Sequence, residues 1–282
     1  MDIAARIKEL ASVDLLSEGR KSGVFVGHPF SLDYDRARVL VADAWKREAG
    51  GIPQGTFLLA FYDNEADDVE EALLLRALCP TKLPTDDDVV ASMVEYYKDD
   101  AETSGGSKQI DQLTRYEFSF SGLECRILGT FYKDGANELQ FGADVENFYS
   151  ANNYSVVKPP ANVLEVIANL REGDAVPGCE ADVRIGVVRY SSTRRFQAES
   201  SPPPVYVSPA DFLAKRTALF GMTRTGKSNT VKKIVQATMD LSGKAKEVVP
   251  AESKSVADNL LQLTDAGLPL YKVGQIIFDV NG

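Results

Sequence analysis

Gly221-Met222-Thr223-Arg224-Thr225-Gly226-Lys227-Ser228 is the stretch of this sequence that decides the fold of its C-terminal part. It fits the pattern G-x-x-x-x-G-K-[ST] at every position, which chance gives a chain of this length only about one time in a hundred. The apolar run at 217–220 predicts a strand before it, and apolar residues at helical spacing in 229–239 predict a helix after it. A phosphate-binding loop requires this order of strand, loop and helix.

The chemistry of such a loop assigns roles to its residues. Backbone N–H groups at the start of the following helix surround the phosphates of a nucleotide. We expect Lys227 to contact the β- and γ-phosphate oxygens as a catalytic residue, and Ser228 to bind Mg²⁺. A glycine turn that only joins a strand to a helix explains neither side chain. The complete set expected around the phosphates is Gly221, Thr223, Arg224, Thr225, Gly226, Lys227, Ser228 and Asn229.

A carboxylate for the metal is expected after a second strand. Residues 275–279 contain three consecutive apolar residues followed by Asp279, which is typical of a buried parallel strand with an acidic residue at its carboxyl end. We expect Asp279 to be the second metal-binding and catalytic residue. A helix predicted over 253–263 is the crossover between the two parallel strands.

These motifs resemble those of the HerA-like family of hexameric DNA-translocating ATPases. Residues 204–230 resemble its strand, short helix and Walker A loop, which reads G-x-T-x-[ST]-G-K-S-N, and residues 276–282 resemble its Walker B segment. The resemblance implies a RecA-like α/β domain that binds ATP and Mg²⁺ and moves along double-stranded DNA, without sequence specificity, as a homo-hexamer. It also implies an effector partner, such as a nuclease or a sirtuin-like subunit, in DNA processing or phage defence.

The resemblance further implies groups beyond Gly282. Family members carry a Glu directly after the Walker B glycine, followed by arginine fingers and channel loops. We therefore expect the chain to be an N-terminal fragment of the enzyme, with little ATPase activity by itself.

The first 180 residues have the pattern of a β-rich domain. Short runs of β-branched and aromatic residues predict a small antiparallel β-barrel, the element that helps the ring assemble in HerA-like proteins. The predicted strands are 22–26, 37–42, 56–62, 116–120, 125–132 and 138–141, with a later pair at 183–190 and 205–207. The predicted helices are 2–16, 69–78, 87–98 and 161–169.

The predicted fold class is therefore a multidomain α+β and α/β protein. An N-terminal barrel domain, 1–180, contains a helical insertion and precedes the first part of a RecA-like P-loop domain, 181–282. Residues 62–111 carry 14 acidic and 4 basic side chains and are interpreted as an acidic, solvated insertion. Within it, Asp86–Asp88 favour a helix start over a metal site, because one run cannot surround a cation.

Composition limits the function classes. The net charge of −10 argues against a general polyanion-binding surface, so DNA contact must be local. Arg194 and Arg195 are candidates for that contact, although a solvated hairpin tip explains them too. His28 is the only histidine and lies beside no nucleophile motif, which excludes histidine-based hydrolases.

Neither a leader nor an 18-residue apolar run is found, so we expect a cytoplasmic protein without a membrane partner. The three cysteines, Cys79, Cys125 and Cys179, are too far apart for a zinc ribbon and are expected to be buried, reduced thiols.

Two other functions fit the sequence. A GTPase-like nucleotide switch is one, because Asp279-Val280-Asn281-Gly282 also fits D-x-x-G. The other is an oligomeric scaffold that docks and activates an effector enzyme while nucleotide only stabilises the ring.

Overall fold

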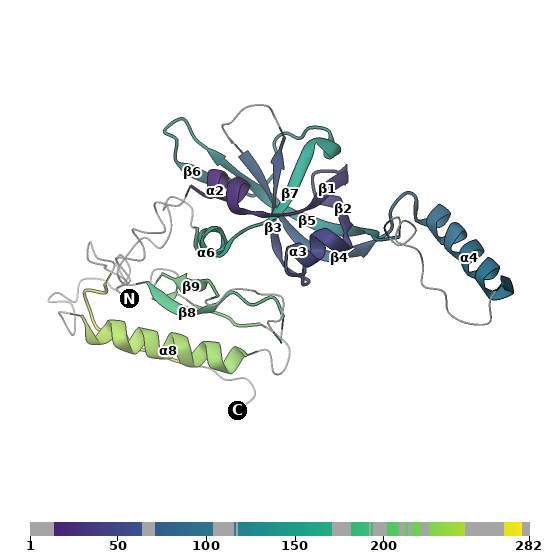
Figure 1. Ribbon diagram of the computed structural model, residues 1–282. Coiled ribbons are helices and arrows are strands. Elements are labelled where there is room, and N and C mark those ends of the chain that lie inside the picture. The colour runs from purple at the N-terminus through teal and green to yellow at the C-terminus, as the bar shows by residue number, and fades with distance from the viewer. Residues whose placement is uncertain are drawn as a thin grey trace. The chain divides into compact units, whose positions relative to one another are not determined.

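The computed structural model of the protein (Figure 1) describes residues 14–63, 71–103, 116, 118–170, 182–191, 193, 202–208, 212–213, 216–220, 226–245 and 268–277. The chain divides into two compact units. One unit consists of Asp14–Leu164 with Arg189–Ser201, and the other contains Glu165–Val188 and Pro202–Gly282. The segment at 189–201 thus belongs with the first unit although the chain on both sides of it belongs to the second.

A closed antiparallel β-barrel of six strands forms the first unit, with a seventh strand, β6, attached. The order around the barrel is β2-β1-β7-β3-β4-β5, and β5 pairs with β2 to close it. The strands are β1 (Val24–Leu32), β2 (Arg36–Ala42), β3 (Phe57–Tyr62), β4 (Glu71–Thr81), β5 (Phe120–Lys133), β6 (Leu139–Gly142) and β7 (Tyr154–Lys158). The predicted N-terminal β-barrel is confirmed.

Strand β5 is long enough to pair with two strands along one edge. Its first half, Phe120–Arg126, pairs with β2, and its last residues pair with β6. The opposite edge pairs with β4 over nearly its whole length. Closure in this way leaves no free strand edge in the barrel.

The barrel interior is filled by small and branched apolar side chains. Alternate residues of each strand point inward. They include Val26, Ala37, Val39, Leu58, Ala60, Leu73, Leu75, Cys125, Ile127 and Val156. Burial raises the pKa of the Cys125 thiol to about 12, and the charges of Glu124 and Cys79 add to this effect. Cys125 is therefore a buried thiol as predicted, whereas Cys79 is exposed and that prediction is wrong; Cys179 lies outside the described residues.

Helix α2 (Leu15–Ser22) covers part of the outer surface of β3. Gly19 lies so close to the strand that a Cβ there would be 3.0 Å from Leu59 and 3.2 Å from Phe61. The helix begins at Asp14, whose side chain accepts from Ser17 N at 3.2 Å and from Lys133 Nζ on β5 at 3.0 Å. This capping carboxylate fastens the start of α2 to the barrel. Residues 2–13 of the helix predicted over 2–16 lie outside the described part.

Two predictions on the barrel strands are wrong, and one strand was missed. Residues 71–78, predicted as part of a helix over 69–78, belong to β4. The predicted acidic insertion at 62–111 thus contains a central barrel strand. Tyr116 is helical and 118–119 form a turn, so the strand predicted over 116–120 begins only at Phe120. Strand β7 was not predicted.

The connection between β4 and β5 carries α4 (Asp86–Thr103). Asp86 Oδ2 accepts from Leu83 N at 2.8 Å, and Asp86–Asp88 occupy the first turn, where the helix dipole favours negative charge. The predicted helix start is confirmed. Val90, Val94 and Tyr97 of this helix are exposed.

His28 has a structural position on β1. Its Nδ1 is 2.9 Å from the carbonyl oxygen of Tyr154, and its ring contacts that of Phe25 with centroids 5.0 Å apart. Helix α3 (Asp43–Glu48) follows β2 and brings Trp45 against Phe25 and Phe120.

The second unit contains a β-hairpin and a long helix. Strands β8 (Val183–Val187) and β9 (Pro204–Val207) are antiparallel, in agreement with the strand pair predicted there. Helix α6 (Ala161–Asn169) ends at Asn169, which is buried. Asn169 donates to Pro204 O at 2.9 Å and accepts from Tyr206 N at 2.8 Å, so it ties the end of α6 to β9.

Helix α8 (Lys227–Gly243) packs in the same unit through a small apolar cluster. Leu241 and Leu213 are its buried members, and Val183, Phe212, Leu268 and Val273 pack against them. Residues 229–239, predicted to be helical, all lie within α8.

Candidate phosphate-binding loop

Gly226 immediately precedes α8 and has a left-handed backbone, with φ 91° and ψ 8°. Glycine adopts this conformation without the steric cost that other residues meet. Thr230 N donates to Gly226 O at 3.0 Å, which is the first bond of the helix. The glycine of the G-K-[ST] motif therefore performs the backbone turn from loop into helix.

The first turn of α8 offers backbone N–H groups without a side-chain cap. Gly226 has no side chain to accept from them, and the turn contains no acidic residue. Helix N-termini carry partial positive charge from these donors. An anion is the ligand that such an end binds best.

Three predicted site residues follow Gly226 on this turn. Lys227 is half-buried at the first helical position, while Ser228 and Asn229 are exposed. A cation, a hydroxyl and backbone N–H groups at one helix end match what the phosphates and the Mg²⁺ of a bound nucleotide require. Lys227 would hold the phosphates and Ser228 would hold the metal. The metal would neutralise charge at the transferred phosphoryl group. The predicted Gly221, Thr223, Arg224 and Thr225 lie outside the described residues.

Residues 273–277 run beside α8 in the opposite direction to the helix. Val273 N donates to Ser242 Oγ at 2.9 Å, near the end of the helix, and Gln275 Nε2 donates to Val235 O at 3.0 Å, near its middle. Ile277 lies further on, beside Val231 and Val235. The segment thus proceeds toward the N-terminal end of α8, and Asp279, two residues beyond Ile277, lies outside the described residues.

The two predicted parallel strands are not formed by the residues that the structure describes. Residues 217–220 and 275–277 pair with no strand there. Phe220 is 92% exposed and Ile276 is 83% exposed, instead of being buried on two faces. A parallel strand needs neighbouring strands and helices on both faces of its sheet, and among the described residues neither segment has a strand partner. The helix predicted over 253–263 falls outside the described part.

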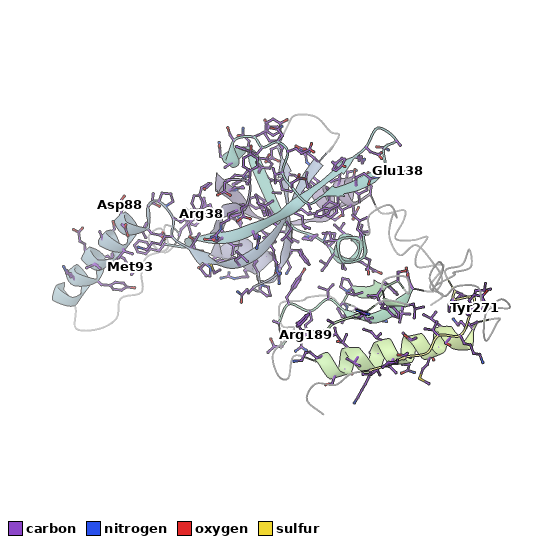
Figure 2. All side chains as sticks on the ribbon, turned by 180° about the vertical axis from the view of Figure 1, so that it is seen from behind. Arg38, Asp88, Met93, Glu138, Arg189 and Tyr271 are labelled. Atoms are coloured by element: carbon purple, nitrogen blue, oxygen red, sulfur yellow. The ribbon has the colours of Figure 1, made fainter. Side chains whose placement is uncertain are left out.

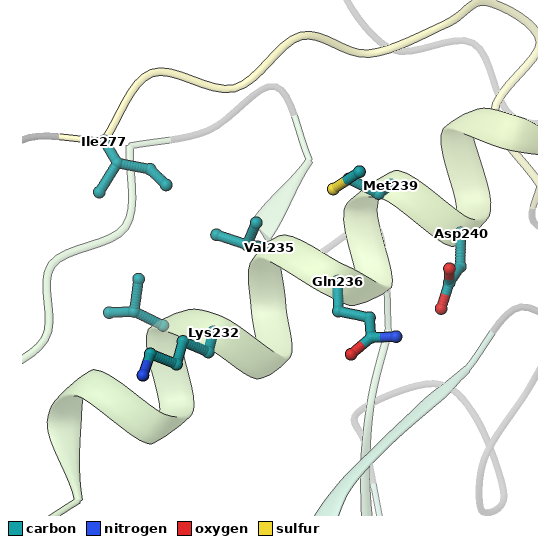
Figure 3. Close-up of a pocket in the computed structure, with 7 residues that line it drawn as sticks. Lys232, Val235, Gln236, Met239, Asp240 and Ile277 are labelled. Atoms are coloured by element: carbon teal, nitrogen blue, oxygen red, sulfur yellow. The ribbon is translucent and has the colours of Figure 1, made fainter.

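A hollow of about 430 Å³ lies along the middle of α8 (Figure 3). Val231, Val235, Met239 and Ile277 give it an apolar lining, with polar groups of Lys232, Gln236 and Asp240 beside them. The hollow is beside the helix and not at Gly226, so its chemistry is unsuited to phosphate. It lies on an apolar side of α8.

Comparison of the chain with protein-family models and with curated proteins finds no match to either. No helix among the described residues is both long and apolar enough to cross a membrane. Arg194 and Arg195, the predicted candidates for DNA contact, also lie outside the described residues. The geometry of Gly226 and the start of α8 is therefore the observation on which a functional proposal depends.

Proposed function

We propose that this chain carries the nucleotide-binding segment of an ATP-dependent DNA translocase of HerA type. In this proposal the chain belongs to a homo-hexamer with a RecA-like P-loop domain that hydrolyses ATP with Mg²⁺ and works with a nuclease or another effector protein. The observation that carries the proposal is the start of α8, where left-handed Gly226 precedes Lys227.

The direction of residues 273–277 supports the same proposal. In a P-loop domain, the strand that ends in the metal-binding carboxylate is parallel to the strand before the loop, and hence antiparallel to the helix after it. Residues 273–277 have this direction relative to α8. Continued in sequence, the segment reaches Asp279, the carboxylate proposed for the metal.

Binding of Mg²⁺·ATP, measured by calorimetry, tests the nucleotide part of the proposal. We expect Lys227→Ala to weaken binding by about tenfold or more, because it removes a charge-assisted contact to phosphate. Lys232→Ala is the matched control, because Lys232 is an exposed lysine of the same helix, away from the loop. Equal affinity of the Lys227→Ala variant and the unchanged protein would contradict the proposed site.

Two further measurements separate the proposed function from its alternatives. Competition between ATP and GTP distinguishes an ATPase from a guanine-nucleotide switch. In the full-length protein, duplex DNA is expected to raise the rate of ATP hydrolysis if the protein is a translocase, whereas a scaffold in which nucleotide only stabilises the ring predicts an unchanged rate.

A further inference from the structure

Three arginines lie directly opposite one another on neighbouring barrel strands. Arg126 of β5 is paired in register with Arg36 of β2 on one side and with Arg76 of β4 on the other. All three are exposed, whereas their neighbours Ala37, Cys125 and Ala77 belong to the core. These residues, called the arginine row below, therefore point outward. Like charges directly opposite on adjacent strands destabilise a sheet, so the row costs the barrel free energy.

Nearby carboxylates compensate the arginine row only in part. Arg36 forms an ion pair with Glu124, and Arg126 Nη2 is 3.7 Å from Asp35 Oδ1. Arg76 has no ion pair with any residue in the described ranges, and its guanidinium lies beside Gly55. Three guanidiniums therefore face two carboxylates, on a chain whose net charge is −10.

Helix α4 carries a complementary surface. Asp88 and Glu95 are both exposed and lie seven residues apart, which places them on the same side of the helix. Figure 2 labels Asp88 on this helix and Arg38, two residues after Arg36, on the barrel. We call Asp88 and Glu95 the acidic stripe. In sequence, α4 contains seven acidic residues and one basic residue. Its acidic side chains therefore repel one another, as the guanidinium groups of the arginine row do.

The two surfaces do not meet within one copy of the chain. The ion pairs of the arginine row go to Asp35 and Glu124 of the barrel. In the described part of the chain, neither Asp88 nor Glu95 has an ion pair, and their neighbour Asp87 forms one with Lys82, 3.4 Å away. Among the described residues, Arg76 of the row and both residues of the acidic stripe thus have no ion pair, while a surface of opposite charge exists on every other copy.

We propose that the acidic stripe of α4 in one copy docks on the arginine row of a second copy. The row spans two strand spacings, about 10 Å, which is close to the diameter of an α-helix with its side chains. Guanidinium groups bind carboxylates in a fixed, two-bond geometry, so three arginines provide orientation as well as charge. The exposed Val90, Val94 and Tyr97 lie elsewhere around the helix and are not part of this contact.

The contact is head-to-tail, because it joins two different surfaces of the same chain. Repetition of such a contact gives a closed ring when the rotation between copies closes, and an open filament when it does not. The inference rests on the barrel and α4 alone, so it does not depend on nucleotide binding at Gly226. Its experiment is therefore carried out without nucleotide.

Charge reversal on each surface, followed by mixing, tests the contact in the full 282-residue chain. Sedimentation velocity over a concentration series should show association of the unchanged protein that weakens as salt rises. Arg76→Glu with Arg126→Glu should weaken association by about tenfold or more, and Asp88→Lys with Glu95→Lys should do the same, because attraction becomes repulsion. An equal mixture of the two variants should associate again, since opposite charges then face each other across copies.

The controls reverse charges away from both surfaces. Arg47→Glu on α3 and Glu138→Lys, near the tip of the β5–β6 hairpin, change exposed residues and should leave association unaltered. Thermal unfolding followed by circular dichroism verifies that each variant is folded. If a charge-reversal variant is not folded, a neutral change on the same surface replaces it: Arg76→Gln on the arginine row or Glu95→Gln on the acidic stripe. These neutral changes should weaken association less than the reversals.

Three outcomes would overturn the proposal. They are a monomer at every concentration, reversed variants that associate like the unchanged protein, and a mixture that remains dissociated. Fluorescence anisotropy with a labelled oligonucleotide tests whether the arginine row binds nucleic acid in place of a second copy. If the protein stays monomeric, and binds the oligonucleotide with an affinity lost in the arginine variant, the row is a nucleic-acid surface instead.

Discussion

In the barrel, every strand is hydrogen-bonded to a neighbour on each side, whereas residues 217–220 and 275–277 beside α8 pair with no strand in the described part of the chain. Both regions contain apolar runs that predict strands. The barrel runs find partners within residues 24–158 and bury their side chains, while Phe220 and Ile276 remain exposed. The difference teaches that an apolar run becomes a strand only where other strands supply the second half of each hydrogen bond.

The comparison of the barrel with the residues beside α8 predicts the largest difference in the free energy of unfolding for two phenylalanine variants, one from each region. Phe61→Ala removes a side chain that is 1% exposed and should lower the free energy of unfolding by about 3–5 kcal/mol. Phe220→Ala removes an exposed ring and should change it by less than about 0.5 kcal/mol. Urea unfolding followed by the fluorescence of Trp45, the single tryptophan, reports on the barrel. Equal effects of the two changes would break the comparison.

Two left-handed glycines give the next effect. Gly129 on β5 has φ 148°, and a Cβ there would be 2.1 Å from Gly142 O, so Gly129→Ala must displace β6. We expect a loss of about 2–3 kcal/mol in the same urea experiment. A Cβ at Gly226 would meet no atom of the described residues within 4 Å, so Gly226→Ala should cost the backbone strain, about 1–2 kcal/mol, measured as a loss of helicity in α8.

Gly135→Ala is the control for both glycines. It lies in a turn where an added Cβ meets nothing within 4 Å, so stability should stay within about 0.5 kcal/mol. If the Gly129 and Gly135 variants unfold at the same urea concentration, the close approach of β5 and β6 is not what requires glycine at position 129.

The smallest effect concerns Asp14, which fastens α2 to the barrel. Burial pushes the pKa of this carboxyl upward, but the bonds from Lys133 and Ser17 outweigh it and hold the pKa below its usual value. Because the pKa of Asp14 is lower in the folded protein than in the unfolded chain, its ionised carboxylate stabilises the fold at pH values above the pKa of the unfolded chain. This stabilisation is lost as the pH falls through the pKa of the folded protein. Asp14→Asn keeps a helix cap and should cost at most about 1 kcal/mol near neutral pH.

Urea unfolding at a series of pH values checks this prediction. The difference between the unchanged protein and the Asp14→Asn variant should be constant above about pH 5 and should vanish as the pH falls below about 4. A difference that is the same at pH 3 as at pH 7 would show that the charge of Asp14 contributes nothing.

The barrel strands could be predicted from sequence where they contain β-branched or aromatic residues, as β2 and β3 do. Arg36–Ala42 alternates between exposed and buried residues in its first half, and the prediction of 37–42 matches β2 closely. Strand β4 escaped prediction because it contains no β-branched or aromatic residue before Thr81, and because burial of Ala72 and Leu74 as well as Leu73 and Leu75 removes the alternation. Its Glu, Ala, Leu and Arg residues also favour helices, a preference that pairing with β3 and β5 overrides.

The candidate site could be predicted where its structure is local. Gly226 and the start of α8 follow from neighbours in sequence, because a left-handed glycine and helical spacing are both short-range signals. Burial of 217–220 and 275–279 depends on strands that no short motif specifies. The assignments of Asp279, ATP, Mg²⁺, DNA and the hexamer therefore stay predictions that the experiments above test.

Closure of the barrel also has a consequence for how the chain folds during synthesis. The ladder between β2 and β5, which closes the barrel, joins Arg36 to Arg126, residues separated by 90 positions in sequence. The contact order of the barrel is therefore high, and its folding is expected to take milliseconds to seconds. Lengthening the β4–β5 connection with α4 adds little to this entropic cost, which grows only with the logarithm of loop length. Until β5 leaves the ribosome, β2 and β4 each have an unpaired edge, and β1 and β3 each have one until β7 follows. A nascent chain in that state is at its most prone to aggregate.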